Sequence, residues 1–267
     1  MKTNPREGYL KSRGHWIHYL IWGATGPRLV LLHSMGMDAH GFDDLANALQ
    51  ENYQILAFDI LDHGDSEKPS EPIGVLDHAE IMREGYLQLG FFPNVLIGHS
   101  IGGMMGIVLA AEHPDELNGL VLVDIAPFDP SKRPARPSPP EHFMDEDEAR
   151  IYIKQRYTEF APEAVENRMK YAFVKDEKGL LHLKGTGETI RKGMGIDLWP
   201  YVERIRVPTM LIIGSISDLI TPEAQQRMRE KIPGLEVATV DGATHMVPQD
   251  KPREFEGLVR AFLKKIG

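Results

Sequence analysis

The sequence contains no cysteine among its 267 residues. This absence excludes disulfide bonds, cysteine-ligated zinc and catalysis by a thiol, and it removes any argument about compartment from redox chemistry. Long hydrophobic runs are also absent, since no apolar stretch approaches the roughly 20 residues of a membrane-spanning helix. The first thirteen residues are polar and charged, unlike a signal peptide. We therefore expect a cytoplasmic protein that does not bind membranes.

Basic residues are fewer than acidic ones. Thirty Lys and Arg residues against 39 Asp and Glu give a formal net charge of −9 at pH 7. A net negative charge disfavours binding to nucleic acids and to anionic membranes, so we expect a small-molecule partner instead. The length fits one α/β domain with an insertion better than two equal domains. Nothing in the composition sets the oligomeric state.

Apolar, β-prone segments alternate with helical patterns along most of the chain, which predicts a mostly parallel sheet. Only three residues separate the segments Tyr9–Lys11 and His15–Trp22. This is hairpin spacing, so we expect the sheet to begin antiparallel. Further strands are predicted at Leu29–His33, Ile55–Ile60, Val95–Ile97, Leu120–Ile125, Thr209–Gly214 and Leu235–Val240, and helices at Gly41–Glu51, Asp77–Leu89, Gly102–His113, Pro222–Lys231 and Pro252–Lys265.

One segment interrupts this alternation. Six prolines lie between Pro127 and Pro140, and the following residues, to about Tyr201, are charged and helix-prone. We expect a core domain of residues 1–126 and 202–267 and a helical insertion of residues 127–201 that caps the carboxyl edge of the sheet, where open α/β folds bind ligands. Its large apolar side chains either line a pocket or hold the insertion together: Phe143, Tyr152, Tyr157, Phe160, Met169, Tyr171, Phe173, Met194 and Trp199.

Residues 95–103 read as an apolar strand that runs into the pattern G-x-S-x-G and then into a helix. This arrangement turns a serine into a nucleophile, and the serine is Ser100. The sharp turn needs strained backbone dihedral angles, and Gly98 and Gly102 lack the Cβ atoms that would collide there. The alternative is a strand–turn–helix joint in which Ser100 only caps the helix.

A serine nucleophile requires a base, and the base requires a partner that fixes its tautomer. His245 follows the last predicted strand on a short loop, at the same sheet edge as Ser100, and is the best candidate among eleven histidines. For the acid we prefer Asp218, which follows the strand Thr209–Gly214 and gives the chain order Ser, Asp, His. Asp124, at the end of Leu120–Ile125, is the alternative.

Acyl transfer also requires donors for the oxyanion. Ile101 supplies one backbone N–H as the residue after the nucleophile, and Met35, on the loop after Leu29–His33, is expected to supply the other. Ser34 either faces the substrate or caps the turn, and we count it with Met246 among the expected substrate-binding residues. This chemistry requires no metal and no cofactor.

Together these motifs resemble the α/β-hydrolase superfamily, and most closely its small bacterial carboxylesterases. The resemblance implies an eight-stranded, mostly parallel sheet with helices on both faces and a lid after the sixth strand. It also implies that Ser100, Asp218 and His245 are nucleophile, acid and base. The segments that carry it are residues 31–36, 59–66, 98–103, 123–127, 214–218 and 242–245.

The sequence therefore predicts a serine hydrolase that cleaves carboxylic esters of small, largely apolar substrates through an acyl-enzyme. A hydrolase of C–C bonds that uses the same triad is the first alternative. Known C–C hydrolases of the meta-cleavage type usually have asparagine before the serine and tryptophan after the histidine. This chain has His99 and Met246 at those places. A ligand-binding receptor with a vestigial triad is a further alternative, because a fold does not fix a function.

Overall fold

In a computed structural model of the chain, residues 4–127, 138–193 and 195–267 are described. One sheet has the strand order β1-β2-β4-β3-β5-β6-β9-β10. The pairs β1–β2 and β2–β4 are antiparallel and the other pairs are parallel, which confirms the expected eight-stranded sheet that begins with a hairpin. The strands are β1 (Arg6–Ser12), β2 (His15–Trp22), β3 (Arg28–Leu32), β4 (Gln54–Phe58), β5 (Asn94–His99), β6 (Leu117–Val123), β9 (Thr209–Gly214) and β10 (Glu236–Val240).

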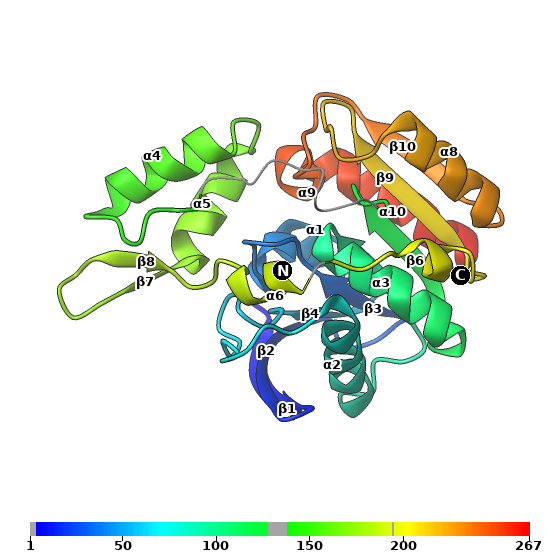
Figure 1. Cartoon of the computed structure of the whole chain (residues 1–267), viewed down its shortest axis with the longest axis horizontal. Helices are drawn as coiled ribbons and strands as arrows, with labels where there is room; N and C mark the ends of the chain where they lie inside the picture. Colours follow the sequence, from blue (N-terminus) through cyan, green and yellow to red (C-terminus); the bar gives the residue numbers. More distant parts are fainter. Residues whose placement is uncertain (1–3, 128–137, 194) are drawn as a thin grey trace.

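Helices cover both faces of the sheet, as Figure 1 shows. The central strands are almost continuously buried, which a parallel sheet requires when both of its faces are packed. One face packs against α2 (Val75–Gln88), α3 (Ile101–Glu112) and α8 (Pro222–Lys231), and the other against α1 (Asp43–Leu49) and α10 (Pro252–Ile266). The short elements η1 (Ala39–Phe42), η2 (Pro114–Glu116) and α9 (Val247–Asp250) complete this part of the fold.

The helix α10 illustrates how the sequence pattern produces this packing. Its buried side chains are Phe255, Val259, Phe262 and Leu263, which follow the spacing of one helical face. The α8 helix begins as predicted, because the hydroxyl of Thr221 accepts a hydrogen bond from the N–H of Ala224 and caps it. All five predicted helices are present, with ends that differ from the expected ones by a few residues.

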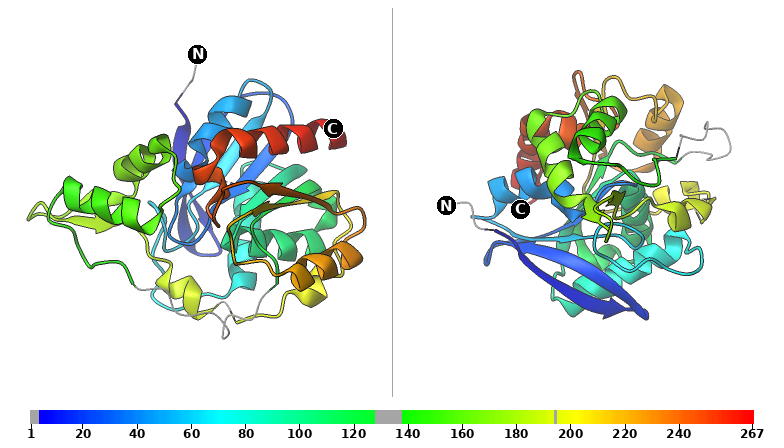
Figure 2. Two further views of the ribbon diagram at one scale, coloured as in Figure 1. Left: turned by 90° about the horizontal axis from the view of Figure 1, so that it is seen from above. Right: turned by 90° about the vertical axis from the view of Figure 1, so that its left-hand side faces the viewer.

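Between β6 and β9 lies the segment predicted as an insertion. Its residues 146–183 extend to one side of the sheet (Figures 1 and 2), whereas Ile190, Leu198 and Val202 from its later part are buried in the same core as α3. The segment contains an antiparallel hairpin that the sequence pattern did not predict, because strands of three residues are too short to show alternation. Residues 128–137 and Met194 lie outside the described part of the chain. The elements are α4 (Glu146–Arg156), α5 (Pro162–Tyr171), β7 (Phe173–Lys175), β8 (Leu181–Leu183), α6 (Glu188–Lys192) and α7 (Trp199–Val202).

The insertion has a small apolar core of its own. Phe143, Phe160 and Phe173 are buried in it, so these aromatic side chains hold the insertion together, as one of the two interpretations expected. Met37 and Met246, from two loops of the main domain, belong to the same cluster. The insertion is therefore packed onto the carboxyl edge of the sheet through these two methionines.

Candidate active site

The predicted sharp turn between β5 and α3 is present, and Ser100 stands at its tip. Ser100 has φ 54° and ψ −114°, a strained conformation for a residue with a side chain. Its N–H donates to the carbonyl of Val123 at 3.0 Å, and its carbonyl accepts from Met104 N–H at 2.9 Å. The turn is thus fixed to β6 on one side and to α3 on the other.

Two glycines permit this turn, for the steric reason expected. A Cβ on Gly98 would lie 2.4 Å from the carbonyl oxygen of Gly102. A Cβ on Gly102 would lie 2.2 Å from the carbonyl oxygen of Leu32, on β3. Both distances are far below van der Waals contact with backbone atoms, so any other residue would force the strand and the helix apart.

Asp124 is the first residue after β6, just as Ser100 is the first after β5. The register pairs His99 with Val123, so the next residues, Ser100 and Asp124, leave neighbouring strands at the same edge. Asp124 has a positive φ of 46°, which aspartate tolerates better than most residues. Its side chain is fully buried.

The carboxylate of Asp124 accepts three hydrogen bonds. Nδ1 of His245 lies 2.7 Å from Oδ2, the hydroxyl of Ser217 donates to the same oxygen at 2.6 Å, and the N–H of Gly214 donates to Oδ1 at 3.1 Å. Because a carboxylate is an acceptor, the Nδ1 atom of His245 must carry the proton. The Nε2 atom of the neutral ring is left with its lone pair, as a general base requires.

The expected partner of His245, Asp218, is not in this position. Asp218 lies four residues beyond the end of β9 and its side chain is exposed. In the part of the chain that the structure describes, it forms no hydrogen bond with His245. This corrects the pairing expected from the sequence: the alternative, Asp124, holds the histidine, because it begins at the strand end nearest to Ser100. Ser217, which the sequence did not single out, supports that carboxylate.

His99 connects the serine turn to the histidine loop. Its Nε2–H donates to the carbonyl of His245 at 2.8 Å, and the two imidazole rings are 5.1 Å apart. Burial lowers the pKa of His99 well below its usual value, so the ring stays neutral and keeps one donor. His245 is therefore hydrogen-bonded to the residue that directly precedes Ser100. The sequence does not reveal this contact, because His99 occupies a variable position of the G-x-S-x-G pattern.

The loop that carries Met35 is a tight turn in which Met37 N–H donates to the carbonyl of Ser34 at 3.0 Å. Gly36 has a φ of 79°, a conformation that glycine adopts without a steric penalty. His33 fixes the start of the turn, because its Nδ1–H donates to Ser34 O at 2.8 Å and its Nε2 accepts from Ile60 N–H at 2.9 Å. Burial lowers the pKa of His33 to about 3, so these bonds persist at neutral pH.

The two expected oxyanion donors stay available in this geometry. Among the residues that the structure describes, neither the N–H of Met35 nor that of Ile101 has a hydrogen-bond partner. Ile101 is the first residue of α3, where a backbone N–H has no partner within the helix. The two residues expected to bind substrate, Ser34 and Met246, are both buried and contact one another, with the hydroxyl 3.9 Å from the sulfur.

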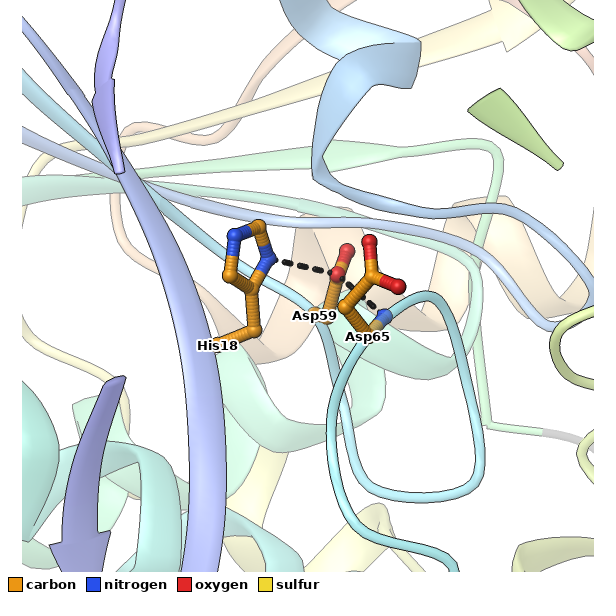
Figure 3. Close-up of side chains that lie close together, drawn as sticks. All are labelled: His18, Asp59 and Asp65. Carbon is orange, nitrogen blue, oxygen red and sulfur yellow. Dashed lines mark hydrogen bonds and ion pairs between the residues drawn. The ribbon is translucent and has the colours of Figure 1, made fainter. Parts of the chain in front are cut away.

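A second group of ionisable side chains, His18, Asp59 and Asp65, lies close enough together to be considered as a metal site. Figure 3 shows His18 pointing at the carboxylate of Asp59, with Nδ1 at 2.8 Å from Oδ2. That carboxylate also accepts N–H bonds from Ala39 and Asp65, and Lys184 pairs with the Asp65 carboxylate at 2.7 Å. The group is thus saturated by protein donors, and its evident role is to fix the loop after β4.

None of the helices in the described ranges combines the length and the apolar character that crossing a membrane requires.

Comparison with known proteins identifies the family of this fold. Residues 27–185 match the family described as the alpha/beta hydrolase fold. The chain is 29% identical over 262 residues to the mouse (Mus musculus) sn-1-specific diacylglycerol lipase ABHD11, covering 90% of this chain and 82% of that one. It is 27% identical over 271 residues to N-formylmaleamate deformylase of Pseudomonas putida, covering 98% and 97%.

A similar fold is found in the crystal structure of E-2-(acetamidomethylene)succinate hydrolase. The two structures superpose with a TM-score of 0.89 over 97% of this chain and 99% of that one, at 23% sequence identity.

Proposed function

Because this chain belongs to the α/β hydrolase fold family, we propose that it hydrolyses carboxylic esters of small, largely apolar substrates through an acyl-enzyme on Ser100. One observation carries the proposal. His245 is hydrogen-bonded to the buried Asp124 at 2.7 Å, at the sheet edge where Ser100 stands on its strained turn. Ser100, Asp124 and His245 each follow a strand of the same sheet, which supports their assignment as nucleophile, acid and base.

In the first half of the reaction, Nε2 of His245 takes the proton of the Ser100 hydroxyl while the oxygen attacks the ester carbonyl carbon. The π electrons of the carbonyl move to its oxygen, which the N–H groups of Met35 and Ile101 stabilise. When this intermediate collapses, the bond to the alkoxy group breaks and His245 gives its proton to the leaving alcohol. Asp124 stays ionised and holds the imidazole in place.

In the second half, a water molecule replaces the alcohol. His245 takes a proton from the water, whose oxygen attacks the acyl carbon, and the same two N–H groups stabilise the second oxyanion. The bond to Ser100 then breaks, the serine oxygen regains its proton from His245, and the carboxylic acid leaves. The chain's own groups account for every proton transfer.

The preference for small apolar groups is supported by the side chains around the turn. Met37 and Met246 are buried where the insertion meets the main domain, and Met35 lies partly buried on the loop that we assign to the oxyanion. Methionine side chains adapt to irregular apolar shapes. We propose that the insertion acts as a cap which encloses this region.

The test is a release assay with p-nitrophenyl esters of graded acyl length, with wild type and Ser100→Ala side by side. We expect turnover that is highest for short chains and a loss of at least about 10³-fold in kcat for the variant. Wild-type inactivity on every ester would reject simple esterase activity. Full activity of Ser100→Ala would reject Ser100 as the nucleophile.

The same assay separates the alternatives. A C–C bond hydrolase would turn over a vinylogous diketone in preference to every ester in the series. A receptor would bind a small ligand with neither ester turnover nor covalent labelling of Ser100 by a fluorophosphonate.

One observation favours a second candidate, hydrolysis of an acyl bond in a substrate that carries a carboxylate. Arg191, on α6, has an exposed guanidinium whose Nη2 lies 3.7 Å from the sulfur of Met35. It has no carboxylate partner among the residues that the structure describes. Arginine binds carboxylates through paired N–H groups. Two of the similar proteins are named for substrates that are carboxylates, a substituted succinate and N-formylmaleamate.

Arg191→Gln distinguishes the two candidates. The second predicts that wild type prefers a p-nitrophenyl hemiester of a dicarboxylic acid over the neutral ester of the same length. It predicts further that Arg191→Gln raises KM for the hemiester roughly tenfold or more without affecting the neutral ester. Arg229→Gln, at an exposed arginine of α8, controls for the change in net charge. Equal preference for the two esters in wild type would exclude this candidate.

A further inference from the structure

One side chain of the insertion reaches the loop that carries Met35. Arg168, on α5, is buried with only 3% of its side chain exposed. Its Nη1 lies 2.5 Å from Oδ2 of Asp38, and its Nη2 donates to the carbonyl of Gly36 at 2.8 Å. A single guanidinium therefore joins two residues of the segment 33–38, one on each side of Met37.

Groups of the main domain hold the same segment near its two ends. His33 fixes the carbonyl of Ser34, and the Asp59 carboxylate accepts the N–H of Ala39 at 2.6 Å. Both of these come from the main domain. Between them, Gly36 at its positive φ is the position with the greatest conformational freedom, and its carbonyl bond comes from the insertion.

Because the ion pair is buried, its net free energy depends strongly on its geometry. Taking a guanidinium and a carboxylate out of water costs free energy that is recovered only when the geometry is good. The planar guanidinium binds two different acceptors at once, which the single ammonium group of a lysine does less well. Its Nε and the Oδ1 of Asp38 are buried without a hydrogen-bond partner in the described part of the chain, so the pair recovers this cost only in part. Such a pair adds little net stability, so its main effect is the position that it imposes on Gly36 and Asp38.

We infer that Arg168 is a positioning residue: through Gly36 and Asp38 it holds the Met35 turn in the conformation that stabilises the oxyanion, so that the docked insertion completes the active site. The inference rests on the proposed function. Arg168 forms its hydrogen bonds with Asp38 and Gly36 and none with Ser100, Asp124 or His245. Its loss therefore impairs the transition state more than the binding of the ester.

The decisive variant is the double replacement Arg168→Met with Asp38→Asn. Arg168→Met alone leaves a buried, unpaired carboxylate and can fail to fold, whereas the double variant removes both charges and keeps the approximate volumes. We expect a folded protein whose kcat for the best p-nitrophenyl ester falls roughly 10- to 100-fold, which is the loss of rate expected when an oxyanion donor is displaced by about 1 Å. KM should change less than about threefold. The single variant Arg168→Lys keeps a positive charge beside Asp38, so its kcat is expected to fall less than that of the double variant.

A second readout reports on the oxyanion itself. A trifluoromethyl ketone with the acyl chain of the best ester forms a tetrahedral adduct with a serine, and its oxygen occupies the oxyanion position. The affinity of the double variant for this inhibitor should fall by the same factor as kcat. A purely structural loss would not move these two quantities together.

Asn167→Ala is the matched control. Asn167 is the neighbouring residue on α5, and its amide donates to Asp43 at 3.0 Å, so it also joins the insertion to the main domain without touching the Met35 turn. We expect a kcat close to that of wild type. Wild-type kcat in the double variant, or an equal loss in Asn167→Ala, would overturn the inference.

Fluorophosphonate labelling of Ser100 in the wild type separates this result from a failure of the proposed function. Absence of labelling and of ester turnover rejects both. A labelled, active wild type whose double variant is unimpaired rejects only the role of Arg168.

Discussion

At the scale of single residues, Asp124 and Asp218 give different outcomes when each is changed to asparagine. Asp124→Asn keeps the shape but turns a carboxylate that accepts from His245 into a group that also donates, so the imidazole loses its fixed tautomer. We expect kcat to fall about 10³- to 10⁴-fold. Asp218→Asn, at an exposed side chain, should stay within a few-fold of wild type. Steady-state kinetics on one ester measure both, and a loss that follows Asp218 would refute the assignment.

Ser100 and His245 could be selected as candidates from the sequence, but the carboxylate that pairs with His245 could not. Ser100 and His245 follow from local patterns, a G-x-S-x-G turn and a histidine after the last strand. Asp124 and Asp218 both follow strands, and chain order favoured the wrong one. The pairing of β5 with β6 decides between the two aspartates, because it brings Asp124 beside Ser100. Sequence patterns carry little information on which strands are neighbours.

Arg168 lies beyond such prediction for a similar reason. It is separated from Asp38 by 130 residues and looks like any charged position on a helix. Only the docking of α5 on the main domain turns it into a buried partner of the Met35 turn.

At the scale of elements, replacing a glycine by alanine is expected to stabilise the protein in one helix and to destabilise it in another. Gly257 is exposed within α10, and a Cβ there would meet open space, so Gly257→Ala should raise the free energy of unfolding by roughly 1 kcal/mol. In α3, Gly102→Ala should lower it by roughly 2 kcal/mol or more, because the Cβ would lie 2.2 Å from the Leu32 carbonyl. Urea unfolding of the two variants measures both changes. A stabilised Gly102→Ala would contradict the close approach of α3 to β3.

The elements themselves were predictable where a repeating pattern is long enough. The β-prone segments and the five longer helices of the main domain were identified because they span at least one full period of strand or helix. The hairpin of β7 and β8 was missed, since each strand has three residues and its stability comes from packing within the insertion.

At the scale of the whole molecule, buried histidines predict a loss of stability in mild acid. Burial lowers the pKa of His33 to about 3 and that of His78 to about 4, and it also lowers those of His63 and His99. Below pH 6.5 the unfolded chain binds protons that the folded chain does not, so the free energy of unfolding falls as pH falls. Each such histidine contributes roughly 1.4 kcal/mol per pH unit.

One buried histidine opposes this trend. Although burial disfavours its charged form, the hydrogen bond to Asp59 raises the pKa of His18, so its contribution is full at low pH and is lost as pH rises. That loss lies above pH 6.5, because between pH 6 and 5 His18 is protonated in both the folded and the unfolded chain. In this range we therefore expect the unfolded chain to bind about three to four more protons than the folded chain, a slope that urea unfolding at several pH values measures. His78→Gln should reduce the slope by about one proton, whereas His142→Gln, at an exposed ring, controls for loss of an imidazole as such. A stability that stays level between pH 6 and 5 would contradict the neutral, buried state of these rings.

The separation of 121 residues between Asp124 and His245 has a consequence during synthesis of the chain. Ser100 and Asp124 belong to one contiguous β5–α3–β6 unit, which leaves the ribosome long before the loop that carries His245. In the proposed mechanism, the Ser100 hydroxyl has no base until β10 has joined the edge of the sheet, and until then it reacts no faster than an ordinary serine. We therefore expect the nascent chain not to attack the esters and acyl donors around it, and the protein to become reactive only when β10 is in place.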